Sequence, residues 1–164
     1  MADSRDLNPD ELIIVTASAE ETRDVARRLA AMLGPGDLVA LTGPLGAGKT
    51  CFVQGLGAGL GMEGPVTSPT FVVMRLHDGV VPLCHMDAYR IEDGMELIEL
   101  GLYDLLAEAV VAIEWADRVA DALPAERLEV AMSYAGDGRE LRLAGHGSRA
   151  AAMIDRMRNY DTGD

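Results

Sequence analysis

Residues 43–50, Gly-Pro-Leu-Gly-Ala-Gly-Lys-Thr, match the phosphate-binding pattern G-x-x-x-x-G-K-[ST]. The glycines of this pattern let successive backbone N–H groups point at one anion, and the following helix N-terminus adds partial positive charge. Lys49 can reach the β- and γ-phosphates of a nucleoside triphosphate, and the Thr50 hydroxyl can bind Mg²⁺. The stretch therefore predicts a nucleotide-binding loop between a strand and a helix of an α/β fold.

The residues around this loop favour a functional motif over a chance match in a glycine-rich chain. The apolar run 38–41 before the loop predicts a strand covered on both faces. A helix is expected to begin near Lys49 and to fray before Gly61 because several interior glycines weaken it. Lys49 is also the only lysine in the chain, since the other thirteen of the fourteen basic residues are arginines.

Other hydrophobic patterns predict further strands and helices on both sides of this unit. Strands are expected at 12–15, 71–76, 80–86, 109–113, 128–134 and 140–143, with two of these pairs forming hairpins. Helices are expected from a Ser18 cap to Leu33, over 91–106 with breaks at Gly94 and Gly101, up to Leu123, and over 148–157. The resulting fold is a P-loop NTPase-like α/β fold whose mixed, mainly parallel central sheet is flanked by helices, with antiparallel hairpins. We expect one domain over residues 1–164, with flexible ends at 1–10 and about 159–164.

Composition and charge exclude several classes of protein. The chain is 49% hydrophobic and 25% charged, which is an ordinary globular balance, and no apolar run approaches the ~20 residues that span a bilayer. Two cysteines without zinc-type spacing predict a reduced, cytoplasmic protein, and the acidic net charge predicts no membrane partner. The net charge of −13 disfavours direct binding to the phosphate backbone of a nucleic acid.

Two carboxylates stand where a P-loop enzyme needs them, at the ends of predicted strands. Asp87 follows the strand at 80–86, and Glu114 follows the strand at 109–113. In open α/β sheets, ligands bind beyond the carboxyl ends of the strands, so both residues are candidates for catalysis or magnesium binding. The alternative for each is an acidic residue that caps the next helix.

Three neighbouring residues allow more than one interpretation. His85 shares a strand face with Asp87, and a hydrogen-bonded structural histidine is favoured over a metal pair. Trp115 is either a core residue or an anchor for a ligand or partner. Cys51 lies in the first helical turn, where the helix dipole could lower its thiol pKa, although a small buried side chain is the simpler interpretation.

Four segments together resemble the bacterial TsaE family, formerly YjeE. They are the loop 43–50, Thr-Ser-Pro-Thr-Phe at 67–71, His-Met-Asp-Ala-Tyr-Arg at 85–90 and Ile-Glu-Trp at 113–115. The resemblance implies an ATPase, weak alone, that is required for threonylcarbamoyladenosine beside the tRNA anticodon. It implies ATP and Mg²⁺ as cofactors, TsaD and TsaB as protein partners, and tRNA only as an indirect partner through that complex.

The same resemblance implies roles for individual residues. Catalysis would fall to Lys49, Asp87 and Glu114, and magnesium binding to Thr50 and Glu114. The nucleotide would contact Ser18, Thr22, Gly46, Ala47, Gly48, Lys49, Thr50, Cys51 and Arg139. Switch or partner-facing positions would be Ser68, Thr70, Arg90 and Trp115. The chain departs from the family at Cys51, where a second Thr is frequent, and at Ala88, where Leu is frequent.

Two other functions remain open on the sequence alone. The P-loop and the chain length also permit a small-molecule kinase, although no arginine-rich lid segment is evident. A non-enzymatic assembly factor that binds nucleotide without hydrolysing it would carry the same motifs.

Overall fold

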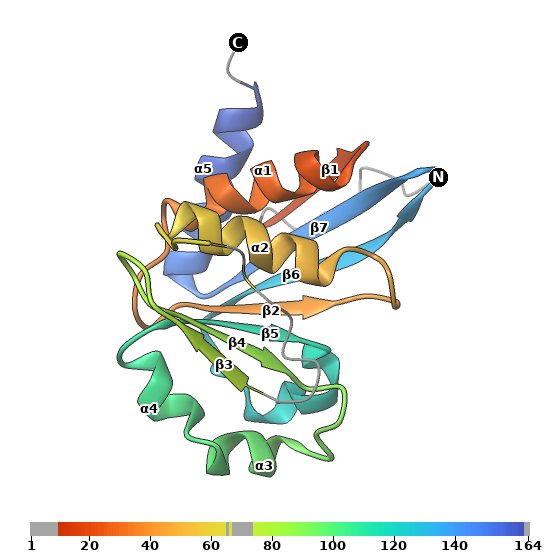
Figure 1. The fold of residues 1–164 in the computed structure, drawn as a ribbon. Coiled ribbons are helices and arrows are strands. Elements are labelled where there is room, and N and C mark those ends of the chain that lie inside the picture. Colours follow the sequence, from red (N-terminus) through yellow and green to blue (C-terminus); the bar gives the residue numbers. More distant parts are fainter. Residues whose placement is uncertain (1–9, 65, 67–73, 163–164) are drawn as a thin grey trace.

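A computed structural model describes residues 10–64, 66 and 74–162 and forms a seven-stranded sheet covered by helices (Figure 1). The strands are β1 (Glu11–Thr16), β2 (Leu38–Thr42), β3 (Met74–His77), β4 (Leu83–Asp87), β5 (Val110–Glu114), β6 (Arg127–Ala135) and β7 (Gly138–His146). The α-helices are α1 (Ala19–Ala30), α2 (Lys49–Gly59), α3 (Gly94–Glu99), α4 (Leu102–Leu106) and α5 (Ser148–Thr162), and a 3₁₀ helix, η1, spans Ala116–Ala122.

The strand order is β1-β7-β6-β2-β5-β4-β3. Strands β6, β2, β5 and β4 run parallel in the centre, whereas β1 with β7, β6 with β7 and β3 with β4 pair antiparallel. The expected mixed, mainly parallel sheet with hairpins is therefore confirmed. The carboxyl ends of β2, β5 and β4 lie at one edge of the sheet, beside the 43–50 loop (Figure 1).

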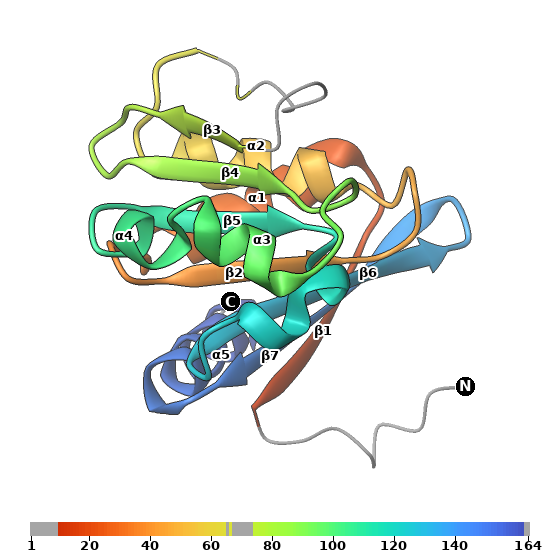
Figure 2. The ribbon, with the colours of Figure 1, turned by 90° about the horizontal axis from the view of Figure 1, so that it is seen from below.

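Hydrophobic residues fill both faces of the central strands because successive side chains alternate between faces. Val39 and Leu41 of β2 belong to the core on the side of α1, α2 and α5, whereas Leu38 and Ala40 belong to the core on the other side. That second core is covered by α3, α4 and η1, which lie in front of the sheet in Figure 2. The two covered faces explain why β2 and β5 have nearly continuous apolar sequences.

Helices α1 and α2 pack closely through glycines. A Cβ atom added at Gly55 would lie 2.3 Å from the Arg23 carbonyl oxygen, and one at Gly59 would lie 2.6 Å from the Ala30 Cβ. These glycines weaken α2 as a helix, but they permit backbone contact between the two helices. The predicted Ser18 cap of α1 is also confirmed, since its hydroxyl accepts a hydrogen bond from the Glu21 N–H at 3.1 Å.

Several element boundaries differ from the sequence predictions. Helix α1 ends at Ala30, before the predicted Leu33, and β4 begins at Leu83 rather than at 80 because Pro82 lacks an N–H for a central strand. The hairpin of β6 and β7 turns through only two residues, since Ala135 pairs with Gly138. The last helix begins at the predicted residue but continues to Thr162. The predicted loop and strand residues at 67–73 lie outside the described residues.

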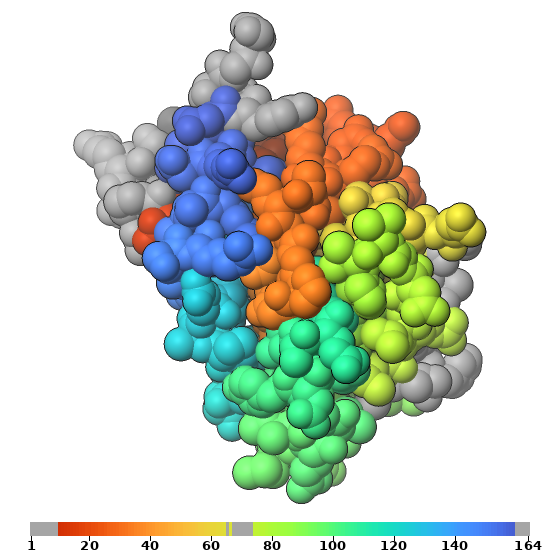
Figure 3. Space-filling view, turned by 90° about the vertical axis from the view of Figure 1, so that its left-hand side faces the viewer, coloured from red at the N-terminus to blue at the C-terminus, as the bar shows by residue number. Residues whose placement is uncertain are grey.

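On the end of the molecule opposite the 43–50 loop, α5 (blue) lies beside the turn before β2 (orange), as the space-filling view shows (Figure 3). The Arg149 guanidinium binds both carboxylate oxygens of Asp37 at 2.8 Å, which joins α5 to the turn before β2. This two-point contact raises the pKa of Arg149. Among the described helices, none has the length and apolar character needed to cross a bilayer.

Candidate nucleotide-binding site

The 43–50 loop lies between β2 and α2, against the hairpin of β6 and β7 (Figure 1). At Gly43 an added Cβ would lie 2.4 Å from the Met132 carbonyl oxygen, so the loop backbone itself touches β6. Gly48 caps α2 with a left-handed backbone (φ +104°), and no described side chain caps this helix. The first N–H groups of α2 therefore remain available to an anion, as phosphate binding requires.

The Lys49 ammonium group is held beside the loop. Its Nζ atom donates hydrogen bonds to the carbonyl oxygens of Gly43 at 2.6 Å and Pro44 at 3.0 Å. It also lies 4.0 Å from the ring centroid of Trp115, within the range of a cation–π contact. Burial lowers the pKa of Lys49, and the carboxylates of Glu114 and Asp87 oppose this shift.

Thr50 and Glu114 are brought together from distant parts of the chain. The Thr50 hydroxyl donates to Glu114 Oε1 at 3.0 Å and is 3.2 Å from Oε2. Glu114 is almost fully buried at the end of β5, and its Oε2 also lies 2.5 Å from Nε2 of the buried His85. The sequence placed Glu114 at this strand end but did not predict its contact with His85.

Asp87 lies beside Glu114 at the same edge of the sheet. The two residues are direct partners in the register of β4 and β5, and Asp87 contributes to the electrostatic environment of Lys49. One Asp87 carboxylate oxygen accepts a hydrogen bond from the Tyr89 N–H at 2.9 Å, which fixes the turn after β4. The structure therefore brings the three predicted catalytic residues, Lys49, Asp87 and Glu114, to one place.

Trp115 adopts an unusual backbone conformation at this place. Its φ of +58° is the one left-handed backbone found at a non-glycine position among the described residues. Such strain is concentrated at functional sites in proteins. The Trp115 ring packs against Tyr89 with centroids 5.0 Å apart, and Tyr89 in turn lies 5.1 Å from the Arg118 guanidinium. The strained turn holds the aromatic ring over Lys49.

A cavity of about 220 Å³ adjoins the loop on the side of α1. It is lined by six predicted nucleotide-contacting residues together with four neighbours: Ser18, Thr22, Gly46, Gly48, Cys51 and Arg139, with Ala17, Ala19, Asp137 and Gly138. The sequence resemblance thus selected residues from three separate elements that enclose one space. Buried Thr22 is fixed there by a 2.7 Å hydrogen bond between its hydroxyl and that of Thr16.

The β6–β7 hairpin also supports the loop through hydrogen bonds to its carbonyl oxygens. The Tyr134 hydroxyl donates to the Leu45 carbonyl oxygen at 2.6 Å, and Arg139 Nη2 donates to the Gly46 carbonyl oxygen at 3.2 Å. The Arg139 guanidinium also lies 4.6 Å from the Tyr134 ring centroid. Tyr134 was not predicted as a site residue, although its position opposite Arg139 in the hairpin register would have indicated it.

The remaining predicted positions are less closely associated with the loop. Arg90 is exposed in the turn after β4, and Ser68 and Thr70 lie outside the described residues. Burial raises the pKa of Cys51, so the thiol is not activated as the helix dipole alone would suggest. Its Sγ donates to the Ala19 carbonyl oxygen at 3.3 Å, which is a packing contact between α2 and α1.

The donor set at Thr50 and Glu114 fits magnesium rather than zinc. Magnesium prefers a hydroxyl or one or two carboxylates, with substrate phosphates and waters completing its shell. Within the described part of the chain, no group of three or more His, Cys, Asp or Glu side chains could hold a metal ion by itself. The alternative His85–Asp87 metal pair is also disfavoured because His85 Nε2 is directed at Glu114.

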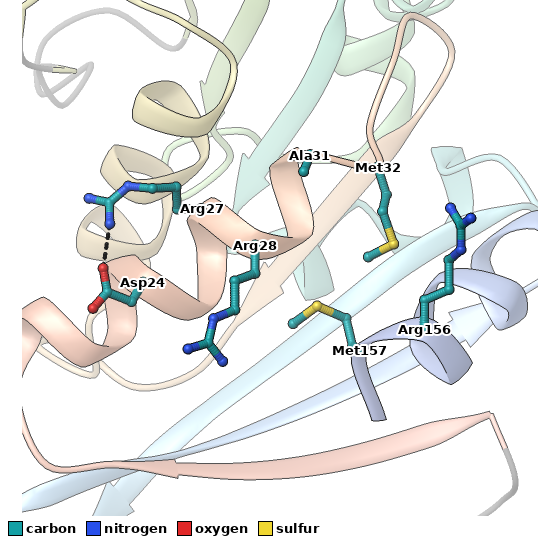
Figure 4. Close-up of a pocket in the computed structure, with 7 residues that line it drawn as sticks. All are labelled: Asp24, Arg27, Arg28, Ala31, Met32, Arg156 and Met157. Carbon is teal, nitrogen blue, oxygen red and sulfur yellow. Dashed lines mark hydrogen bonds and ion pairs between the residues drawn. The ribbon is translucent and has the colours of Figure 1, made fainter. Parts of the chain in front are cut away.

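A larger cavity of about 580 Å³ lies elsewhere, between α1 and α5 (Figure 4). Its lining is Asp24, Arg27, Arg28, Ala31, Met32, Arg156 and Met157. In Figure 4 the two methionine side chains lie between Arg28 and Arg156, and Arg27 binds Asp24. None of the predicted site residues lines this cavity, so its size does not make it the candidate site.

The glycine-rich loop between a parallel strand and a helix, with carboxylates at the neighbouring strand ends, defines a P-loop α/β protein. The profile of the family "Threonylcarbamoyl adenosine biosynthesis protein TsaE" matches residues 16–141. The chain therefore belongs to the TsaE family, which is involved in the biosynthesis of threonylcarbamoyladenosine in tRNA.

Similar proteins agree with this assignment. The chain is 41% identical to a tRNA threonylcarbamoyladenosine biosynthesis protein TsaE from Bacillus subtilis, covering 89% of this chain and 93% of the relative. It is 44% identical to the protein of the same name from Streptomyces coelicolor, covering 79% of this chain and 93% of the relative. The crystal structure of YdiB from Bacillus subtilis superposes with a TM-score of 0.78 at 36% identity, covering 93% of this chain and 97% of YdiB.

Proposed function

We propose that this protein is the ATP-hydrolysing subunit of the threonylcarbamoyladenosine system and acts with TsaD and TsaB in the cytoplasm. The observation that carries the proposal is the convergence of Lys49, Thr50 and Glu114 at one edge of the sheet, where the hydroxyl and the carboxylate are 3.0 Å apart. Family membership supports a role in threonylcarbamoyladenosine biosynthesis, and the convergence of these three residues supports ATP hydrolysis. ATP hydrolysis alone is expected to be slow and to increase with the partners.

Phosphate binding falls to residues 46–51 in this proposal. The N-terminus of α2 directs uncapped N–H groups toward the phosphates, and Lys49 supplies a full positive charge. The rest of the nucleotide would occupy the 220 Å³ cavity, where Ser18, Thr22 and Arg139 line the wall. An acidic chain thus holds a polyanion through a local concentration of backbone donors.

Catalysis falls to the two carboxylates. Thr50 and Glu114 would hold Mg²⁺, which when bound neutralises charge on the transferred phosphoryl group. Asp87, half-buried beside Glu114, would accept a hydrogen bond from the attacking water and so orient it. Trp115 would keep the Lys49 stem and ammonium group in place on the side of the strands.

The direct test is ATP turnover by the purified protein with and without TsaB–TsaD and tRNA. Wild-type protein should hydrolyse ATP slowly alone and faster with the partners, and Lys49→Ala should abolish both rates and multiple-turnover tRNA modification. Arg156→Ala, on the exposed surface of α5, is the control and should behave as wild type. Unchanged modification turnover in Lys49→Ala would contradict the proposal.

The carboxylate variants separate an ATPase from an assembly factor that only binds nucleotide. Asp87→Asn should bind ATP within a few-fold of wild type but lose at least roughly a hundred-fold in turnover, because general-base contributions are about 10²–10⁴. Glu114→Gln should also lose turnover, together with much of the Mg²⁺-dependent gain in ATP affinity. If both variants keep full modification activity, hydrolysis is not the function of the site. Phosphorylation of an added small-molecule acceptor would instead favour a kinase.

A further inference from the structure

His85 is a buried polar residue that the proposed function does not yet use. It lies in β4, two residues before Asp87, and its side chain is fully buried. Its Nε2 atom is 2.5 Å from Glu114 Oε2, a contact that crosses from β4 to β5. The Nδ1 atom is buried and has no hydrogen-bond partner among the described groups.

The sheet register explains how His85 reaches Glu114. His85 is paired with Ala112 and Asp87 with Glu114, so His85 and Glu114 lie diagonally on adjacent strands. Side chains two residues apart on a strand share one face, and Leu83 of this set packs in the core on the α2 side. His85 therefore lies under α2, on the face that carries the loop.

Glu114 needs hydrogen-bond donors because a buried carboxylate is otherwise very unfavourable. Two donors contact it, the Thr50 hydroxyl from α2 and His85 from β4. Thr50 is also a proposed magnesium ligand, so its hydroxyl has a second role in the loaded site. His85 has no such second role, and its one hydrogen-bond partner among the described residues is the Glu114 carboxylate.

We propose that His85 is a positioning residue whose Nε2–H holds the Glu114 carboxylate toward Thr50, and this inference rests on the proposed function. Filling space alone would be served by an apolar side chain and would not leave the buried Nδ1 unpaired. The hydrogen bond to Glu114 accounts for a histidine at this place. Mutation of a residue that hydrogen-bonds a metal-binding carboxylate or imidazole typically lowers metal affinity or activity by about 10–100-fold.

The test compares His85→Gln with His85→Leu. The Gln amide can still donate to Glu114, whereas Leu fills the space without a donor. The Leu variant should lower kcat about 10–100-fold and raise the KM for Mg–ATP, and the Gln variant should recover most of this loss. Calorimetry should show that the gain in ATP affinity on adding Mg²⁺ shrinks in the Leu variant and persists in the Gln variant.

A second variant and a measurement without metal distinguish loss of the hydrogen bond from misfolding of the Leu variant. His85→Asn carries an amide that is too short to reach Glu114, so it should resemble the Leu variant although it remains polar. Long-range ¹H–¹⁵N spectra of the metal-free wild-type protein should show His85 protonated at Nε2.

The inference is overturned if Leu and Asn variants lower only the unfolding temperature, while kcat and the Mg²⁺-dependent gain in affinity stay at wild-type values. An Nε2-deprotonated imidazole would also overturn it. Failure of the proposed function looks different: wild-type protein would then show no ATP turnover with its partners, and Lys49→Ala would change nothing.

Discussion

At the scale of single residues, the phosphate loop depends on side chains that hold its carbonyl oxygens. Lys49 contacts two of these oxygens from within, and Tyr134 and Arg139 contact two others from the hairpin. A loop whose carbonyls are fixed in this way keeps its N–H groups turned toward the anion before it arrives, which lowers the ordering cost of binding.

Tyr134→Phe tests this support. The variant loses only the hydrogen bond to Leu45, and a typical net hydrogen bond contributes about 1 kcal/mol, so ATP affinity should fall roughly five-fold in calorimetry. Tyr103→Phe is the matched control because its hydroxyl also donates to one carbonyl oxygen, that of Ala122, on the α3–α4 side. It should lose similar stability and no ATP affinity. Equal ATP affinities in wild type and Tyr134→Phe would show that the hairpin does not contribute to ATP binding.

Cys84 provides a pH test at the same scale. Burial raises the pKa of its thiol from 9.0 to about 11, so the folded state keeps the proton after the unfolded state has lost it. The contribution of the protonated Cys84 thiol to the free energy of unfolding is therefore complete below pH 9 and disappears as the pH rises from 9 to 11. Between pH 8 and 10.5, wild type should lose about 2 kcal/mol more unfolding free energy than Cys84→Ala in urea titrations. If the unfolding free energies of wild type and Cys84→Ala changed in parallel with pH, the Cys84 thiol would not be the cause of the loss.

The sequence predicts individual site residues where a motif fixes their spacing, and it misses those that depend on pairing. Lys49 and Thr50 follow from the loop pattern, and Asp87 and Glu114 follow from their places at strand ends. The His85–Glu114 contact joins residues 29 positions apart and depends on the β4–β5 register. No local pattern carries that register, which is why the histidine remained ambiguous in the sequence.

At the scale of elements, the contact between α1 and α2 positions the cavity wall against the loop. Residues on α1 line the 220 Å³ cavity, and α2 carries the phosphate donors, so their separation sets the shape of the site. That separation is small because Gly55 has no side chain to meet the Arg23 backbone.

Gly55→Ala tests this packing against intrinsic helix propensity. Propensity alone predicts about 1 kcal/mol of stabilisation in a helix interior. The close backbone contact predicts the opposite, a loss of about 1–3 kcal/mol measured by denaturant unfolding, because backbone atoms cannot rotate away. Gly34→Ala is the control, since nothing would lie within 4 Å of a Cβ added there, and it should be close to neutral. Stabilisation in Gly55→Ala would contradict close packing of the helices.

Sequence periodicity predicts elements better than it predicts their ends. The strand–loop–helix unit from β2 to α2 and the break between α3 and α4 at Gly101 appear as expected. The start of β4 was misplaced because the apolar run continues through Pro82, which a central strand excludes. The hairpin strands were predicted too short because exposed residues of β6 and β7 carry no hydrophobic signal.

At the scale of the whole molecule, the fold class followed from the motif, but the strand order did not. β6 lies next to β2 and β1 lies at the edge of the sheet, while α5 packs on the same face as α1 and α2. Several topologies are compatible with the same local sequence pattern, and contacts between residues far apart in the chain decide among them.

The net charge of −13 also acts at this scale. A field of this sign repels the phosphate backbone, so the protein alone should not retain tRNA at physiological salt, with no saturation below roughly 10 µM in filter binding. Retention should appear only when TsaB and TsaD are added. Submicromolar tRNA binding by the isolated chain would show that it contacts the substrate directly.

Whether the 43–50 loop binds the phosphates of ATP can be measured by calorimetric titration of the purified protein with ATP and Mg²⁺. We expect one site per chain in wild type and at least a ten-fold weaker site in Lys49→Met, a variant with a similar stem and no charge. Wild-type protein that shows no heat of binding, or a Lys49→Met variant that binds as tightly as wild type, would contradict this expectation.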